Sequence, residues 1–314
     1  MQNLIFSLNT VAPVFMIVFV GYFLKKFGRI NDNFVAVSSR VVFNVALPCL
    51  VFVKLATTDF TRAFKPELIV LAYLGTFFIF IMSWALALFL SKEGRDQGAF
   101  IQASVRSNYA IVGFAIIAAM FGDDALSNAS ILLAFIMPIY NALAVIALTV
   151  PLQREKQVGV LRTIIEIFKN PLIIAVFVAL PFSIFEIHLS LFIFNSLNYL
   201  ASLSLPLALL GIGASLNFES IKKDSRLAII ATTIKIIITP LLLVFIAVKM
   251  GIAGQDLGIL FVLFACPTAI ATFVMAEAMG ANGELTGNII VMSTLGSVGT
   301  ISIGIFILKS LGLI

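Results

Sequence analysis

Hydrophobic runs of about twenty residues alternate with short loops that carry most of the charged residues. An α-helix of that length spans the hydrocarbon core of a bilayer, because each residue adds about 1.5 Å. No segment shows the apolar and polar alternation of a membrane β-strand. The pattern predicts an all-α polytopic membrane protein with ten spans, at residues 9–24, 41–55, 67–90, 99–121, 127–150, 171–185, 189–216, 227–248, 257–279 and 285–308.

The loops on the two sides of these spans differ in their basic residues. Loops that follow the odd-numbered spans hold thirteen Lys and Arg residues, whereas the other side holds five. Basic residues accumulate in cytoplasmic loops, so we expect a multi-pass protein of the plasma (inner) membrane with both termini outside. Lys25, Lys26 and Arg29 follow the first apolar run, which argues against a cleavable signal peptide.

Composition narrows the class of protein further. Of the 314 residues, 61% are hydrophobic and 11% are charged, and the net charge of +5 follows from the loop bias, with no sign of nucleic-acid binding. Cys49 and Cys266 lie inside apolar runs, and His188 is the sole histidine, in a predicted outer loop. The sequence has no nucleophile elbow, paired metal-binding histidines or phosphate loop. We therefore expect no enzyme, cofactor or metal site, and any pumping to draw on an ion or substrate gradient.

An internal repeat appears when the chain is shifted by 158 residues. The matches extend from the first to the fourth span of each half and pair Pro13 with Pro171, Pro48 with Pro206, Phe60 with Phe218 and Gly122 with Gly280. Each half has five spans, an odd number, so the second half enters the membrane from the opposite side. Such inverted repeats are common in secondary transporters, with the site near the midplane where the halves meet.

The repeat predicts how the chain is organised. The first five-helix repeat covers residues 1–151, a charged cytoplasmic linker covers 152–169, and the second, inverted repeat covers 170–314. The linker is too short for a soluble domain.

Two predicted spans carry polar residues and helix breakers at membrane depth. Arg106 lies in the fourth span, where an arginine costs about 2.5 to 3.5 kcal/mol on insertion scales and usually faces a polar interior or a substrate path. Pro267 lies in the ninth span, removes a backbone donor and clashes with the preceding turn. Interrupted helices persist in membranes only where they line a cavity or are buried in protein.

We predict the substrate site where these two interrupted spans meet. We expect the fourth span to be interrupted near Asn108 to Gly113 and the ninth near Pro267 to Ala269. The half-helices that begin there present free backbone amides and a positive dipole end, which suit an anion. The candidate substrate-binding residues are Arg106, Ser107, Asn108, Tyr109, Gly113, Pro267, Thr268, Thr272 and Asn44. Small and hydroxyl residues in a span are also typical of a close packing face, and that alternative stays open.

Several of the polar residues have two interpretations. Arg106 pairs with a substrate carboxylate or with a protein acid such as Glu277. Lys235, deep in the eighth span, is a partner for the fourth or ninth span or an ion-coupling group. Glu277 reaches the cytoplasmic interface or takes up a coupling proton or sodium ion. Asn44, four residues before Pro48, supports a helix kink or contacts the ligand.

Four motifs resemble the auxin efflux carrier family, which includes bacterial malate and malonate permeases. In order, they are residues 44–48 (NVALP), 106–113 (RSNYAIVG), 170–171 (NP) and 265–269 (ACPTA), and the likeness covers almost all of the chain. The resemblance implies a fold shared with bile acid symporters. Spans one, two, six and seven would form a scaffold and the others a moving transport domain, with crossed helices four and nine at the site. It also implies organic-anion substrates and a homodimer.

Two departures from the family's pattern change the expectation. Family members often have Gly-x-Pro after the fourth-span asparagine, whereas this chain has Gly113, Phe114 and Ala115. We therefore expect a milder break there, or one set by Gly113 alone. The short linker favours a bacterial-type permease over a plant exporter regulated by phosphorylation.

The sequence thus predicts a secondary transporter of small organic anions, such as dicarboxylates or auxin-like carboxylates, with an elevator mechanism. Arg106, Asn108 and the half-helix ends would hold the carboxylate, and a proton or sodium ion is the candidate coupling ion. Two alternatives remain: a sodium-coupled carrier of bile-acid-like acids, and a membrane sensor that binds a ligand without moving it. Sodium dependence of uptake distinguishes the first, and binding without counterflow supports the second.

Overall fold

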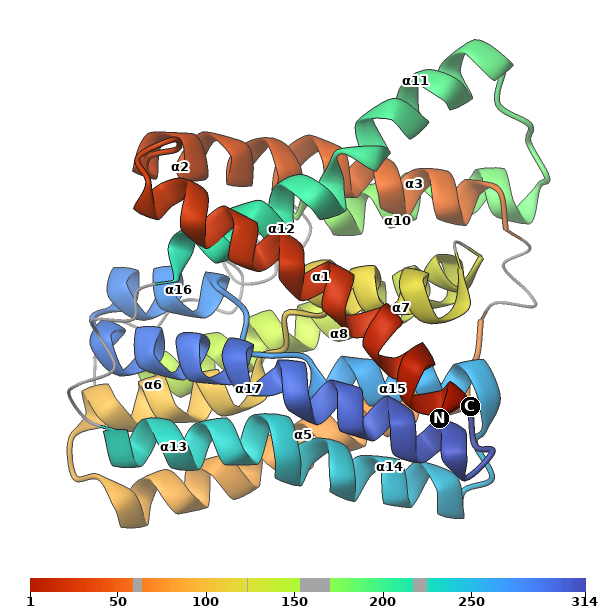
Figure 1. Ribbon diagram of the computed structural model, residues 1–314. Helices are drawn as coiled ribbons and strands as arrows, with labels where there is room; N and C mark the ends of the chain where they lie inside the picture. Colours follow the sequence, from red (N-terminus) through yellow and green to blue (C-terminus); the bar gives the residue numbers. More distant parts are fainter. Residues whose placement is uncertain (59–63, 123, 153–169, 217–224) are drawn as a thin grey trace.

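A computed structural model describes residues 1–58, 64–122, 124–152, 170–216 and 225–314 (Figure 1). Almost all of the predicted linker 152–169 therefore lies outside the described residues. The described α-helices are α1 (Gln2–Lys26), α2 (Asp32–Val41), α3 (Leu47–Ala56), α5 (Pro66–Leu90), α6 (Gly94–Val105), α7 (Phe114–Phe121), α8 (Ala125–Thr149), α10 (Pro171–Ile184), α11 (Leu191–Ser202), α12 (Ser204–Ser215), α13 (Ser225–Thr233), α14 (Thr239–Lys249), α15 (Gly254–Ala265), α16 (Ala271–Met279) and α17 (Gly283–Ser310).

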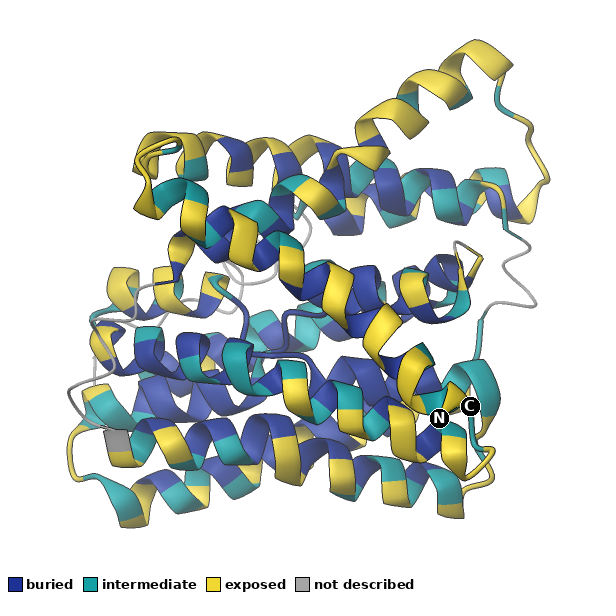
Figure 2. Ribbon diagram, in the orientation of Figure 1, coloured by how far each residue is buried: buried dark blue, intermediate teal, exposed yellow. Residues whose placement is uncertain are grey.

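The helices confirm an all-α polytopic membrane protein. In the described ranges, seven continuous helical segments are long and apolar enough to cross a membrane, and three shorter apolar helices of 10–17 residues accompany them. Each of the ten predicted spans overlaps one of these segments. Large apolar side chains such as Phe89, Phe192 and Leu241 are exposed, as expected for a protein that contacts lipid. Exposed and buried positions alternate along the outer helices (Figure 2). The inverted repeat itself stays a prediction.

Three π-helical turns occur within the described residues, at Val42–Ala46, Tyr109–Gly113 and Ile234–Ile238. Two of these turns end two residues before a proline, Pro48 and Pro240. A proline ring clashes with the carbonyl four residues earlier, and a wider turn relieves that clash without ending the helix. These turns therefore let the second and eighth spans continue through their prolines.

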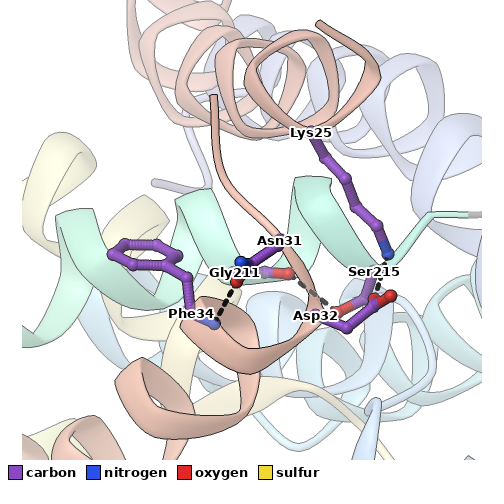
Figure 3. Close-up of polar contacts among 6 residues, drawn as sticks. All are labelled: Lys25, Asn31, Asp32, Phe34, Gly211 and Ser215. Carbon is purple, nitrogen blue, oxygen red and sulfur yellow. Dashed lines mark hydrogen bonds and ion pairs between the residues drawn. The ribbon is translucent and has the colours of Figure 1, made fainter. Parts of the chain in front are cut away.

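The second span begins earlier than its apolar run predicts. Asn31 caps α2, because its side-chain oxygen accepts a hydrogen bond from the backbone N–H of Phe34 at 2.9 Å (Figure 3). Asp32 also pairs with Lys25 of α1, with 2.5 Å between Nζ and Oδ1. Asp32 is exposed, so this ion pair contributes at most about 1 kcal/mol. The cap starts a helical segment that continues without interruption to Ala56.

The helices separate into two groups in Figure 1. In the upper group α1 packs along α12 and α3 packs against α10, while below them α5 packs on α6 and α8, and α17 packs on α13 and α16. Both termini lie close together at one end of the molecule (Figure 1). The assignment of these groups to a scaffold and a moving transport domain stays a prediction.

The contact between α1 and α12 depends on glycine. A Cβ atom at Gly21 would lie 2.1 Å from the backbone oxygen of Leu210, and one at Gly213 would lie 1.7 Å from that of Val18. No side chain fits at such distances, so the two backbones pack directly on each other. Close approach through small residues is how membrane helices gain packing energy without a hydrophobic driving force between them.

Candidate functional site

The predicted fourth and ninth spans are both interrupted, and the two interruptions lie against each other. α6 ends at Val105 and α15 ends at Ala265. Beyond them the chain runs extended, and Ser107 and Thr268 form an antiparallel β-bridge. The backbone N–H of Asn108 donates to Pro267 O at 2.8 Å, and that of Ala269 donates to Arg106 O at 3.2 Å. The two breaks thus satisfy each other's backbone groups, as interrupted helices inside a membrane must.

Side chains from each break cap the other helix. Ser107 Oγ donates to Leu263 O near the end of α15 at 2.6 Å, and Thr268 Oγ1 donates to Ala103 O near the end of α6 at 2.7 Å. The last carbonyls of a helix lack partners within it, so these two hydroxyls supply the missing donors. Ser107 and Thr268 therefore stabilise the crossing by capping helix ends. The sequence had suggested instead that they bind the substrate.

Thr268→Val tests this interpretation of the crossing. Valine keeps the shape of the side chain but removes the donor to Ala103 O, leaving a buried carbonyl short of a partner. Such a loss costs about 1 to 3 kcal/mol, so we expect a lower unfolding temperature of the purified protein in detergent. Thr233→Val is the matched control, because Thr233 is only partly buried and donates to Ile229 O in its own helix. Equal melting of the two variants would contradict the capping role.

The break in the fourth span differs from the prediction. We expected it between Asn108 and Gly113 or at Gly113 alone, but the interruption covers Arg106 to Asn108 and Gly113 is helical, with φ −61°. Gly113 instead leaves room for Tyr109, because a Cβ there would lie 2.7 Å from the tyrosine ring. In the ninth span the break covers Cys266 to Ile270, which includes the predicted interruption near Pro267 to Ala269. Pro267 sets it, because the residue before a proline favours an extended conformation and Cys266 has ψ 145°.

Arg106 lies half-buried at the crossing and makes no ion pair with Glu277. Its Nη1 instead approaches the Met275 sulfur of α16 at 2.8 Å, and Gln102 Nε2 approaches the same sulfur at 3.6 Å. Glu277 is exposed near the end of α16, with its carboxylate against Gly283. This position agrees with an interfacial glutamate, the simpler of its two interpretations.

A small cavity of about 10 Å³ adjoins the guanidinium, enough for roughly one water molecule. Its lining combines apolar and polar side chains, namely Phe80, Val105, Leu143, Ala144, Gln102, Arg106 and Tyr140. Buried polar atoms without a partner in the described part of the chain include Gln102 Oε1, Tyr109 OH and Thr272 Oγ1. Unpaired buried polar groups are costly, and of these three residues only Gln102 lines the cavity.

Lys235 is fully buried and donates to Phe264 O at 3.1 Å. Phe264 lies in the last turn of α15, where the partial negative charge of the helix dipole favours a cation. Lys235 is thus a partner of the ninth span, which agrees with one of its two predicted interpretations.

Asn44 is exposed on the π-helical turn of the second span and does not line the cavity beside Arg106.

Three side chains beside Arg106 were not predicted from the sequence as site residues. Gln102 is four residues before Arg106, so the two share a helix face, and a polar residue one turn from a buried arginine was a usable signal. Tyr140 of α8 and Met275 of α16 gave no such signal, because their approach to Arg106 depends on how separate helices pack.

Comparison with known proteins gives the family. A family model described as "Membrane transport protein" matches residues 6–162 and 157–305. An uncharacterized transporter of Methanocaldococcus jannaschii is 23% identical over 91% of this chain and 94% of its own length. A proposed malonate transporter of Rhizobium meliloti is 24% identical over 96% and 95%, and an uncharacterized transporter of Escherichia coli is 21% identical over 97% and 98%. The chain therefore belongs to the membrane transport protein family, which confirms the resemblance seen in its motifs.

Proposed function

We propose that this transporter is a secondary carrier of small organic anions across the plasma membrane, with Arg106 as the cation that binds the substrate carboxylate. The observation that supports it most strongly is the guanidinium at the helix crossing, which has no acid partner in the described part of the chain. A cation that is partly withdrawn from water at membrane depth and has no counter-ion is costly unless a ligand supplies the negative charge. The name of the Rhizobium meliloti relative favours a dicarboxylate as the substrate.

The size of the cavity supports movement during transport. About 10 Å³ does not admit an organic acid, so this conformation is closed around the site. We propose that the group containing α5–α8 and α13–α17 carries the site past the group containing α1–α3 and α10–α12. Both termini would lie outside, and the candidate coupling ion is a proton or sodium.

Counterflow in proteoliposomes tests the proposal. Vesicles loaded with unlabelled malonate should accumulate labelled malonate from outside without any imposed ion gradient, because exchange needs only alternating access. Malate and indole acetate should be tried in the same way, and sodium or pH gradients added afterwards to identify the coupling ion. Protein-free vesicles are the control. If the purified protein binds these acids but shows no counterflow, the chain is a sensor and the proposal is wrong.

A further inference from the structure

Two donors at the site point to one weak acceptor. Met275 Sδ lies 2.8 Å from Arg106 Nη1 and 3.6 Å from Gln102 Nε2. A thioether carries no charge and accepts hydrogen bonds poorly, whereas a carboxylate accepts charge-assisted bonds from a guanidinium. The sulfur therefore occupies a place where a carboxylate oxygen would bind much better.

Met275 is suited to leave that place. Its side chain is unbranched with three rotatable bonds, so it can reorient without a change in the backbone. It is also only partly buried on α16, which leaves room for the side chain to withdraw. The guanidinium and its amide neighbour would then be free to bind an anion.

Gln102 adds a constraint on the ligand. Its side chain is 2% exposed, and its Oε1 has no hydrogen-bond partner in the described part of the chain, while its Nε2 points toward the sulfur. An unpaired buried acceptor is satisfied by a ligand that brings a donor. The pair Arg106 and Gln102 thus fits a carboxylate next to a hydroxyl, an N–H or a protonated second carboxyl group, between the apolar walls formed by Phe80 and Leu143.

We propose that Met275 is a displaceable internal ligand of Arg106, whose thioether holds the carboxylate position until the substrate takes it. The inference rests on the proposed function, because it assumes that an organic anion binds at Arg106. It assigns Met275 a role in setting affinity: every substrate must compete with the sulfur for the same donors. At position 275, a side chain that cannot accept a hydrogen bond should therefore strengthen substrate binding. A side chain that accepts hydrogen bonds better than a thioether should weaken it.

Two substitutions of similar size test the competition in opposite directions. Met275→Leu removes the acceptor and should lower the Kd of malonate by about threefold to tenfold, the value of one modest hydrogen bond. Met275→Gln supplies a stronger acceptor and should raise that Kd. Binding is measured by calorimetry on the full-length protein in nanodiscs. Met279→Leu is the matched control on the same helix, because Met279 packs beside Ala276 and Ala281 and should leave the Kd unchanged.

The NMR resonance of the Met275 methyl group reports directly on the displacement of its side chain. In protein labelled with ¹³C-methyl methionine, the resonance missing from Met275→Leu identifies Met275, and malonate should shift it more than that of Met279. Equal or weaker binding by Met275→Leu, with malonate binding that still depends on Arg106, would overturn the displacement and leave the proposed function standing. If none of malonate, malate and indole acetate binds the wild-type protein, both proposals fail together.

Discussion

Arg106→Gln is expected to reduce the initial rate of organic-anion counterflow by about thirtyfold or more, since removal of one partner of a buried charge pair costs about 2 kcal/mol at least. Glutamine retains hydrogen-bonding ability but loses the charge and the two-pronged geometry that matches a carboxylate. Arg106→Lys keeps the charge but loses the two-pronged geometry, so its counterflow rate should lie between those of the wild type and Arg106→Gln. The unfolding temperature without substrate should not fall, because the substitution removes a half-buried cation that has no counter-ion in the part of the chain that the structure describes.

The matched control for this effect is Arg40→Gln. Arg40 is an exposed arginine in the last turn of α2, so its loss changes the net charge equally without touching the crossing. Rates are compared in vesicles containing equal amounts of folded protein. Counterflow by Arg106→Gln at the rate of Arg40→Gln would remove Arg106 from the binding site.

Gly213→Ala is expected to destabilise the protein strongly, although it adds only one methyl group. The added Cβ would lie 1.7 Å from Val18 O, a backbone atom that cannot turn aside, so α1 and α12 must separate. Overpacking of this kind costs about 1 to 3 kcal/mol or more, and in a large chain each kcal/mol lowers the unfolding temperature by about 2 °C. We expect a fall of several degrees in detergent, with a lower yield of monodisperse protein.

Gly299→Ala separates this packing effect from the general effect of replacing a helical glycine. Gly299 lies within α17, and a Cβ there would meet no described atom within 4 Å. Alanine favours helix over glycine by about 0.5 to 1 kcal/mol, so this variant should melt at the same or a slightly higher temperature. Similar falls in both variants would show that the backbone contact between α1 and α12 is not what limits stability.

The spans were predictable because bilayer thickness fixes the length of an apolar helix, whatever the rest of the chain does. The break near Pro267 was predictable for a similarly local reason, since a proline cannot donate to the preceding turn. The break at Arg106 was misplaced toward Gly113. No local breaker marks it, and its hydrogen-bond partners lie in a segment distant in the sequence.

The candidate site was predicted only in part. Arg106 stands out because charge is rare at membrane depth. Ser107 and Thr268 were correctly placed at the crossing, yet their hydroxyls serve helix ends, which no pattern within one span reveals. Met275 looks like any other apolar residue of a membrane helix. Its contact with Arg106 follows from the packing of α16 against α6, which no local sequence pattern reveals.

The π-helical turn at Ile234–Ile238 has a consequence for which deletions the eighth span can accept. The turn contains one residue more than a regular helical turn, and it widens the helix where the Pro240 ring meets the carbonyl of Ile236. Lys235 lies within this turn and donates to Phe264 O of α15. Loss of one codon here would therefore bring back the proline clash and rotate Lys235 about the helix axis relative to α14.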